Sequence, residues 1–567
     1  MSTGSEVTAA ATFCATLADE WARAGVRHAV VCPGSRSTPL ALALADERRL
    51  AVEVVHDERS AAFLALGIGL ATGVPAVVLT TSGTAAAELH PAVVEAGLAD
   101  VPLLVCTADR PPELQDVGAP QTIDQAHLFG GSVRWFTAPE VPDDARRATW
   151  RPLAARALAE ATGARPGPVH LNLAFREPLV GAPGPLPPGR DGDVPWLRAA
   201  PRPEATADGD ASAVAALLSG RRGLVVAGGR SPAAPAAVER LAARLGWPVL
   251  AEPRAAGLWR PGAVTHADAL LRVPGFAGVR PEVVLRTGEP PASKLLAQWL
   301  ADVPAVALVG AGRWIDPAGS VAATWPAAGT DALARAVEPG DDDRWARRWQ
   351  DADRAAAAAI EATLARHAEP TEPAVARDVV AHLPAGAMLV VSSSMPVRDV
   401  EWYAAAREDV RVLANRGANG IDGVVSTAVG VALATGAPTT VLVGDVAFLH
   451  DSNALVGLAD RPVDLTVVVV DNGGGGIFSF LPQAASLDPA RFELLFGTPH
   501  GTDLAGLAGA HGLDARVVTR QAEVGPAVTA AAGRHRPEVL IVRTDRSANV
   551  AVHDELHAAV AAALPPG

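Results

Sequence analysis

Two predicted strands end in side chains that suit a hard divalent cation. The segment TTVLVGD ends in Asp445, and LTVVVVDN ends in Asn472, 27 positions later. Alone, each could be a turn residue that caps a helix. In an open α/β sheet, however, ligands bind at the carboxyl ends of the strands, and Mg²⁺ takes carboxylate, amide and carbonyl oxygens beside phosphate and water. The pair therefore predicts a metal site made by Asp445, Asn472 and the carbonyl of Gly474, with Mg²⁺ or Mn²⁺ as the ion.

Four glycines, 473–476, follow Asn472. Glycines just past a strand often let the backbone approach a phosphate. A dinucleotide fingerprint starting at Gly473 or Gly474 would need its last glycine where Phe478 or Ser479 stands. No Lys-Ser/Thr pair follows either, so the loop is not a Walker loop. The glycines favour a diphosphate held through the metal.

A candidate acid lies in the first third of the chain. The segment VEVVHDERSAAFLALG predicts the end of a strand followed by a helix, with Glu58 in the first helical turn. The helix dipole alone favours a carboxylate there, so a structural explanation is also open.

The chain carries an internal repeat. Residues 65–84 (ALGIGLATGVPAVVLTTSGT) align without gaps to residues 428–447 (AVGVALATGAPTTVLVGDVA), an offset of 363. Each copy reads as a helix, a TG-x-P turn and a strand. Shared Ala/Gly composition is one explanation; common descent of the two regions is the better one. At this offset Glu58 corresponds to Ile421, so the acid belongs to one copy.

Continuous apolar strands alternate with Ala-rich helical segments, which is typical of parallel sheets covered on both faces. We predict an α/β fold of three doubly wound parallel-sheet domains, the first and third homologous. The predicted strands are HAVVCPG, PAVVLTTSG, VPLLVCTAD, PVHLNLA, RGLVVAGG, EVVLRTGE, AVALVGAG, AMLVVSSS, TTVLVGD, LTVVVVDN and EVLIVRT.

Domain boundaries follow from composition. The Pro/Gly-rich stretch 181–196 predicts a linker, and a polar helix that ends near Pro370 predicts a second connection. The expected domains are 1–190, 206–340 and 371–567.

Composition narrows the class of protein. With 48 basic and 62 acidic residues among 567, the net charge of -14 argues against nonspecific nucleic-acid binding. Three cysteines without metal-ligand spacing fit a reducing cytoplasm. Neither a signal peptide nor an apolar run long enough to span a membrane is expected. We expect a cytoplasmic enzyme with small-molecule partners.

The combined pattern resembles a known family. GDV at 444–446, followed by DN at 471–472, resembles the signature of the thiamine-diphosphate (ThDP) enzymes, with Val446 and Asp471 as small departures. The resemblance implies a pyrimidine-binding first domain, a diphosphate-binding last domain, and sites formed between subunits of a homodimer or tetramer. It also implies that Glu58 hydrogen-bonds the cofactor pyrimidine and that Ile421 supports the bent cofactor.

Further segments resemble one branch of that family. They are PGSRSTPLALA (33–43), TSGTAAAELHPAVVEA (81–96), TADRPPEL (107–114) and NRGANGIDG (415–423). That branch decarboxylates 2-oxoglutarate and adds the succinyl carbanion equivalent to isochorismate in menaquinone biosynthesis. Both substrates carry two carboxylates, which Arg pairs with bidentately.

The resemblance assigns roles to residues at matching positions. The catalytic group comprises Glu58, Arg36, Arg398 and Arg416. The cofactor-binding group comprises Ser35, Glu58, Ser394, Ile421, Asp445, Asn472 and Gly474. The substrate-binding group comprises Ser35, Arg36, Arg110, Gln121, Lys294, Ser394, Arg398, Arg416 and Phe478.

Two other functions stay open. One is a different ThDP-dependent 2-oxoacid decarboxylase or carboligase, against which the set of Arg residues argues. The other is a noncatalytic ThDP-binding protein, which the presence of Glu58, Asp445 and Asn472 disfavours. The segment VVAGGRS of the central region lacks a dinucleotide fingerprint, so no flavin is expected.

Overall fold

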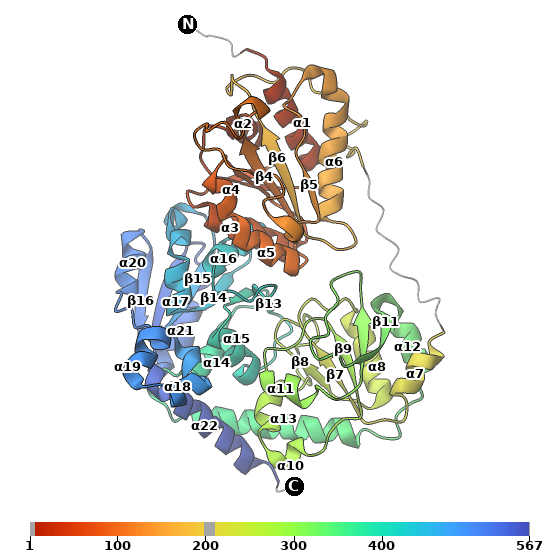
Figure 1. Cartoon of the computed structure of the whole chain (residues 1–567). Coiled ribbons are helices and arrows are strands. Elements are labelled where there is room, and N and C mark those ends of the chain that lie inside the picture. Colours follow the sequence, from red (N-terminus) through yellow and green to blue (C-terminus); the bar gives the residue numbers. More distant parts are fainter. Residues whose placement is uncertain (1–5, 198–209, 566–567) are drawn as a thin grey trace. The chain divides into compact units, whose positions relative to one another are not determined.

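The computed structural model describes residues 6–197 and 210–565 and contains three parallel sheets (Figure 1). The predicted fold of three α/β sheets is therefore confirmed. The start of the expected central domain, at 206, lies outside the described residues. The chain forms two compact units, the first of residues 1–202, 415–436 and 450–463, and the second of the remainder. Among the described helices, none is both long and apolar enough to cross a membrane.

The first unit is built on a six-stranded sheet. One face packs on α1 (Ala9–Arg23), α2 (Thr38–Asp46) and α6 (Trp150–Ala161) through alternate strand residues such as Val31 and Leu79. The other face contacts α3 (Glu58–Thr72). The strand order is β2 (Ala51–Val54), β1 (His28–Val31), β3 (Val77–Thr80), β4 (Leu103–Asp109), β6 (Pro168–Ala174) and β5 (Trp135–Thr137).

A second six-stranded sheet, in the second unit, repeats this order of strands. It runs β13 (Arg411–Leu413), β12 (Met388–Val391), β14 (Thr439–Gly444), β15 (Leu465–Asp471), β17 (Glu538–Arg543) and β16 (Asp514–Val518). Because β14 and β15 are parallel neighbours with Gly444 opposite Val470, the residues after both strands lie at one edge. The predicted metal site requires that β14 and β15 be neighbours, and they are.

The central sheet has a different topology. Its order is β11 (Val321–Pro326), β10 (Ala305–Val309), β9 (Val283–Thr287), β7 (Gly223–Ala227) and β8 (Val249–Ala251). The helices α7 (Ser212–Leu218), α8 (Pro235–Leu245) and α12 (Thr330–Ala336) pack on it. The predicted connecting helix is α13 (Arg344–Leu364), which leads into α14 (Glu372–His382).

The other helices complete the two units. They are α4 (Thr84–Glu88), α5 (His90–Leu98), α9 (Ala267–Leu271), α10 (Pro274–Ala277), α11 (Lys294–Trp299), α15 (Met395–Tyr403), α16 (Val424–Thr435), α17 (Asp445–His450), α18 (Pro482–Ser486), α19 (Pro489–Phe492), α20 (Leu504–Ala510), α21 (Gln521–Ala531) and α22 (Arg546–Ala563).

The two repeat copies contact each other through their helices, α3 and α16, within the first unit. A Cβ atom on Gly67 would lie 2.1 Å from the carbonyl oxygen of Thr427, and one on Gly430 would lie 2.0 Å from that of Leu64. At the offset of 363, Gly67 corresponds to Gly430 and Leu64 to Thr427. The two close contacts are therefore equivalent, and the helices pack with a local twofold symmetry.

Candidate active site

The predicted metal residues converge on one backbone N–H group. Gly474 N donates to Asp445 Oδ2 at 2.9 Å and lies 3.1 Å from Asn472 Oδ1. Asp445 is the first residue of α17, and its side chain is buried. Its other oxygen, Oδ1, accepts a hydrogen bond from Val446 N at 2.7 Å. The structure thus brings Asp445, Asn472 and Gly474 together, in the second unit.

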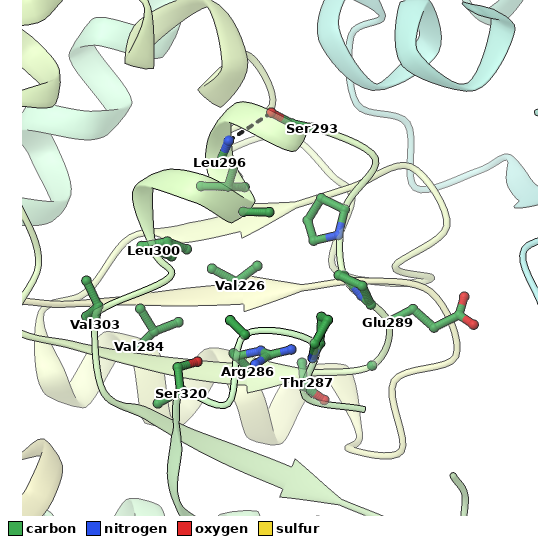
Figure 2. A pocket seen from close by; sticks show the side chains of 17 residues that line it. Val226, Val284, Arg286, Thr287, Glu289, Ser293, Leu296, Leu300, Val303 and Ser320 are labelled. Carbon is green, nitrogen blue, oxygen red and sulfur yellow. Dashed lines mark hydrogen bonds between the residues drawn. The ribbon is translucent and has the colours of Figure 1, made fainter. Parts of the chain in front are cut away.

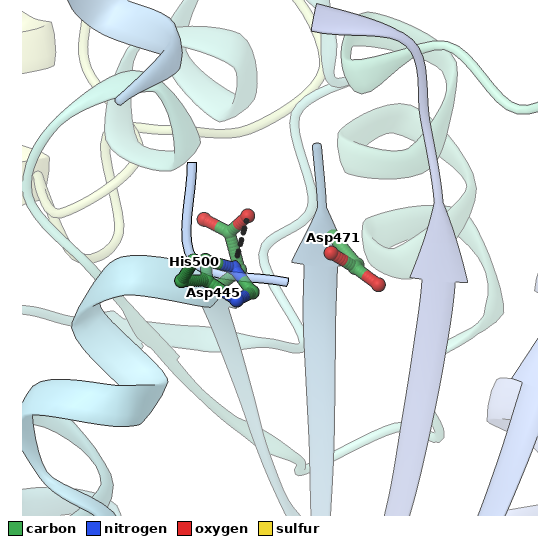
Figure 3. A group of neighbouring side chains, drawn as sticks. All are labelled: Asp445, Asp471 and His500. Carbon is green, nitrogen blue, oxygen red and sulfur yellow. Dashed lines mark hydrogen bonds and ion pairs between the residues drawn. The ribbon is translucent and has the colours of Figure 1, made fainter. Parts of the chain in front are cut away.

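His500 supports Asp445 from a separate loop. Asp445, Asp471 and His500 each place one possible ligand atom within 4.8 Å of the others (Figure 3). Thr502 N donates to His500 Nδ1 at 3.0 Å, so in a neutral ring the proton is on Nε2. Nε2 lies 3.3 Å from Asp445 Oδ2 and donates to it. His500 therefore orients the Asp445 carboxylate. Because both of its ring nitrogens are engaged in hydrogen bonds, the candidate metal ligands are the oxygen atoms.

The charge around Asp445 suits a divalent cation. Burial raises the pKa of Asp445 above its usual value. The buried carboxyls of Glu372 and Asp399 also have raised pKa values, each chiefly because of burial. Buried carboxylates are costly unless paired or bound to a metal. Oxygen donors beside several buried acids fit Mg²⁺ or Mn²⁺.

The glycine loop also has a packing explanation. Gly474 has φ +156°, and a Cβ atom on it would lie 2.1 Å from the carbonyl oxygen of Gly497. A Cβ atom on Gly475 would lie 2.2 Å from the carbonyl oxygen of Phe496. The loop is therefore pressed against residues 496–497, and this contact requires glycine there whatever ligand it meets.

A strained residue starts the helix that carries Arg398. Ser394, at the N-cap of α15, has φ 77° and ψ -135°, a region that non-glycine residues rarely adopt. Arg398 donates to the Ser394 carbonyl oxygen from the next turn. Both residues lie just past β12, at the same end as Asp445, because β12 and β14 are parallel neighbours.

Lys294 and Phe478 also belong to the second unit. Lys294 is exposed at the start of α11. The buried Glu401 of α15 accepts hydrogen bonds from Ala292 N and Ser293 N, at 2.6 and 2.9 Å, and so ties this helix start to α15. The ring of Phe478 packs against that of Phe496 at a centroid distance of 5.4 Å.

A separate pocket lies between the central sheet and α11 (Figure 2). It is mainly apolar, with Val226, Val284 and Leu296 in its wall. Its Arg286 is paired with Asp316 at 3.1 Å. Of the described residues that line it, none belongs to the predicted site.

The first unit gathers cations at the carboxyl edge of its sheet. Arg36 follows β1, is buried, and donates to the Phe175 carbonyl oxygen at 2.9 Å. Burial, and then the nearby charge of Arg110, lowers the pKa of the Arg36 guanidinium. Glu177, whose Oε1 lies 3.5 Å from Arg36 Nη1, and Asp109 oppose this lowering. Ser35 is exposed beside Arg36.

Gln121 and Glu58 lie in the same unit. Gln121 is exposed, has φ 57°, and donates through its side-chain amide to the Ser82 carbonyl oxygen at 3.1 Å. Glu58 is half-buried and is the first residue of α3. Burial, and then the charge of Glu58, raises the pKa of the Cys32 thiol, so Glu58 lies near the end of β1.

The loop with Arg416 is anchored by an acid. Glu95 of α5 is buried and accepts hydrogen bonds from Gly417 N and Ala418 N, both at 2.6 Å. Arg416 is half-buried in this loop, and Ile421 lies three residues before α16.

Glu372, His500 and Glu95 were absent from the sequence prediction. Glu372 accepts a hydrogen bond from Asn472 Nδ2 at 2.7 Å. The three residues come from α14, from the loop after Gly497 and from α5, without a fixed spacing to the residues they support. Only Glu95 lies in a segment that resembles the family, residues 81–96.

Family models match most of the chain in three parts. Residues 11–128 match the N-terminal TPP binding domain of thiamine pyrophosphate enzymes, TPP being another name for ThDP. Residues 190–391 match a middle domain of such enzymes, and residues 399–542 match their C-terminal TPP binding domain.

Curated relatives match nearly the full length. Several of them are named 2-succinyl-5-enolpyruvyl-6-hydroxy-3-cyclohexene-1-carboxylate synthase. The relative from Saccharopolyspora erythraea is 45% identical to this chain, and the match covers 97% of this chain and 98% of the relative. The relative from Myxococcus xanthus is 44% identical (97% of both chains), and the one from Chloroflexus aurantiacus is 42% identical (97% and 96%). The chain belongs to the thiamine pyrophosphate enzymes and, among them, to the 2-succinyl-5-enolpyruvyl-6-hydroxy-3-cyclohexene-1-carboxylate synthase family.

Proposed function

We propose that this chain catalyses the ThDP-dependent decarboxylation of 2-oxoglutarate and the addition of the succinyl unit to isochorismate, a step of menaquinone biosynthesis. The observation that carries the proposal is the convergence of Asp445 and Asn472 on Gly474 N, in a chain 45% identical to a synthase of that name. In this proposal residues 1–190 bind the pyrimidine, 206–340 form the central domain, and 371–567 bind the diphosphate.

Residues of the second unit would hold the diphosphate through the metal. Asp445 Oδ, Asn472 Oδ1 and the Gly474 carbonyl would supply the oxygen ligands for Mg²⁺ or Mn²⁺. His500 and Val446 N hold the carboxylate of Asp445 in place. When bound, ThDP supplies an electron sink for loss of CO₂ and for carbon–carbon bond formation.

Residues of the first unit would handle the proton and part of the substrate charge. Glu58 would exchange a proton with the cofactor pyrimidine through its half-buried carboxyl group, and Ile421 would support the ring system. Such acid–base work contributes on the order of 100- to 10,000-fold.

Polar and cationic side chains would bind the two dicarboxylates. Arg36 and Arg110 are suited to this role because a guanidinium group pairs bidentately with a carboxylate. Phe478 would form an apolar wall. The other residues of this group are Ser35, Gln121, Lys294, Ser394, Arg398 and Arg416.

We further propose a cytoplasmic homodimer, or a tetramer built from it, with sites at subunit interfaces. Mass measurement in solution, with and without ThDP and metal, tests the assembly. A protein that stays monomeric while fully active would contradict it.

Substrate comparison tests the reaction. With ThDP, Mg²⁺ and isochorismate present, 2-oxoglutarate should give CO₂ and the succinylated product, whereas pyruvate should give little turnover. Preference for pyruvate would instead favour another ThDP-dependent carboligase. Full occupancy by ThDP without turnover of any 2-oxoacid would favour a noncatalytic binding protein.

Glu58→Gln tests the acid directly. It should lose about 100- to 10,000-fold in kcat, because the amide cannot exchange the proton, and should retain ThDP binding. Turnover assays and calorimetric ThDP titration measure the two effects. Glu160→Gln, at a partly exposed acid near the end of α6, is the control and should behave as wild type. Full activity of Glu58→Gln would exclude the role given to Glu58.

A further inference from the structure

Glu372 lies behind the predicted metal ligands. It is the first residue of α14, and its side chain is 4% exposed. The start of this helix is already capped, because Thr371 accepts a hydrogen bond from Ala374 N through its side chain. The buried carboxyl group of Glu372 is therefore not needed as a helix cap.

The contact of Glu372 with Asn472 selects one orientation of an amide. Asn472 Nδ2 donates to Glu372 Oε1 at 2.7 Å. Asn472 Oδ1 then points toward Gly474 N, which also donates to Asp445 Oδ2. A half-turn of the amide would set Oδ1 against Glu372 Oε1 and turn Nδ2 toward another donor.

That orientation matters because only the oxygen of an amide can bind a cation. With Nδ2 directed at Glu372, Oδ1 lies on the side of Asp445, where the second predicted ligand is. Gly476 leaves the room that this amide occupies, because a Cβ atom there would lie 2.6 Å from Asn472 Nδ2. In either protonation state Glu372 retains an oxygen that accepts the bond.

We propose that Glu372 is a positioning residue of the metal site, which holds Asn472 Oδ1 toward the divalent cation by accepting the hydrogen bond from Asn472 Nδ2. This inference rests on the proposed function, in which Asn472 is a metal ligand. Partners that orient a metal ligand typically contribute about 10- to 100-fold to metal affinity.

Mn²⁺ titration followed by electron paramagnetic resonance, with ThDP present, tests the proposal. Glu372→Ala should weaken Mn²⁺ binding by about 10-fold or more, because the amide is free to turn. Glu372→Gln should stay within about threefold of wild type, because its side-chain oxygen can accept the same bond. Glu361→Ala removes an exposed carboxylate that pairs with Arg377 of α14 and should bind Mn²⁺ as wild type does.

Circular dichroism and melting midpoints establish that each variant is folded. Should Glu372→Ala fail to fold, Glu372→Met, which fills a similar volume without an acceptor, replaces it with the same expectation. A folded Ala or Met variant with wild-type Mn²⁺ affinity overturns the proposal. Equal weakening in Glu372→Gln and Glu372→Ala also overturns it, since orientation would then not be the cause. A wild-type protein without a saturable Mn²⁺ site overturns this inference together with the proposed metal site.

Discussion

Asp451 illustrates how burial changes a single carboxyl group. Its side chain is fully buried in the first unit, where Ser426 donates to it through N at 2.7 Å and through Oγ at 3.0 Å. Burial raises its pKa to about 7, although these bonds and Arg59 oppose the change. In the folded protein the pKa of Asp451 is higher than the usual value for Asp. Its contribution to stability is therefore fully present at pH values below that usual pKa. The contribution is lost as pH rises through about 7.

Asp451→Asn should therefore change the pH dependence of stability. The amide cannot ionise and can still bond Ser426, so the variant should melt at a higher temperature than wild type at pH 8. The difference in stability between the variant and wild type should be smaller at pH 5 than at pH 8. This difference should change by at most about 4 kcal/mol between the two pH values. Thermal scans from pH 5 to 8 measure it. Asp460→Asn, at an exposed acid, is the control. A difference that does not vary with pH would show that ionisation of Asp451 is not involved.

Sequence could indicate some site residues and not others, for a physical reason. Asp445 and Asn472 were predictable because parallel neighbouring strands bring their carboxyl ends to one edge. Glu372 and His500 act through side chains that approach from elements distant in sequence. Neither residue has a spacing that sequence alone could interpret, since their importance follows from burial and hydrogen bonds.

At the scale of elements, helix packing between the repeat copies depends on two glycines. The backbone of α3 meets that of α16 at Gly67 and Gly430, where a Cβ atom would lie about 2 Å from a carbonyl oxygen. Such overlap forces the helices apart along their length, because the contact atoms belong to backbone and cannot rotate away.

Gly67→Ala and Gly430→Ala should each destabilise the protein by about 1–3 kcal/mol or more, and by similar amounts. Their equivalence follows from the local symmetry of the contact. Denaturant unfolding measures the two effects. Gly509→Ala in α20 is the matched control, because a Cβ atom on Gly509 would meet nothing within 4 Å, and it should be neutral or slightly stabilising. Strongly unequal effects of the two changes would argue against the symmetric contact.

Whether a strand could be predicted from the sequence depended on its position in the sheet. The eleven strands predicted from apolar runs are present and are the interior strands of the three sheets. The edge strand β2 was predicted only through its end before Glu58, and it is present too. The strands without a prediction, β5, β8, β11, β13 and β16, all lie at sheet edges. Edge strands are short or partly exposed, as in β16 with the pattern DARVV, so they lack the continuous apolar run that marks a buried strand.

At the scale of the whole molecule, the proposed cofactor residues belong to both compact units. Glu58 and Ile421 belong to the first, and Asp445 and Asn472 belong to the second. A ligand that binds only the folded protein stabilises it by about 2.7 kcal/mol at 100 times its Kd. Stabilisation should therefore reach both units.

Addition of ThDP and Mg²⁺ should raise the melting midpoint and slow hydrogen exchange in both units, near residues 33–36 and near 472–478. Removal of the metal with EDTA should reverse both effects. Hydrogen exchange followed by mass spectrometry, together with thermal scans, measures them. Asp445→Asn should show neither effect, because it lacks the charge that holds the metal. Protection confined to one unit would contradict the proposal that residues of both units bind the cofactor.

The reciprocal glycine contact has a bearing on ancestry. Two copies of one sequence that meet through equivalent residues are what a single-domain homodimer leaves behind when its gene duplicates and fuses. In such an ancestor both helices would have begun with the same residue. Here one begins with Glu58, while Ile421 stands at the corresponding position of the other copy. Fusion would have let the copies diverge, so that one kept or gained an acid while the other became apolar, and a symmetric pair became an asymmetric enzyme.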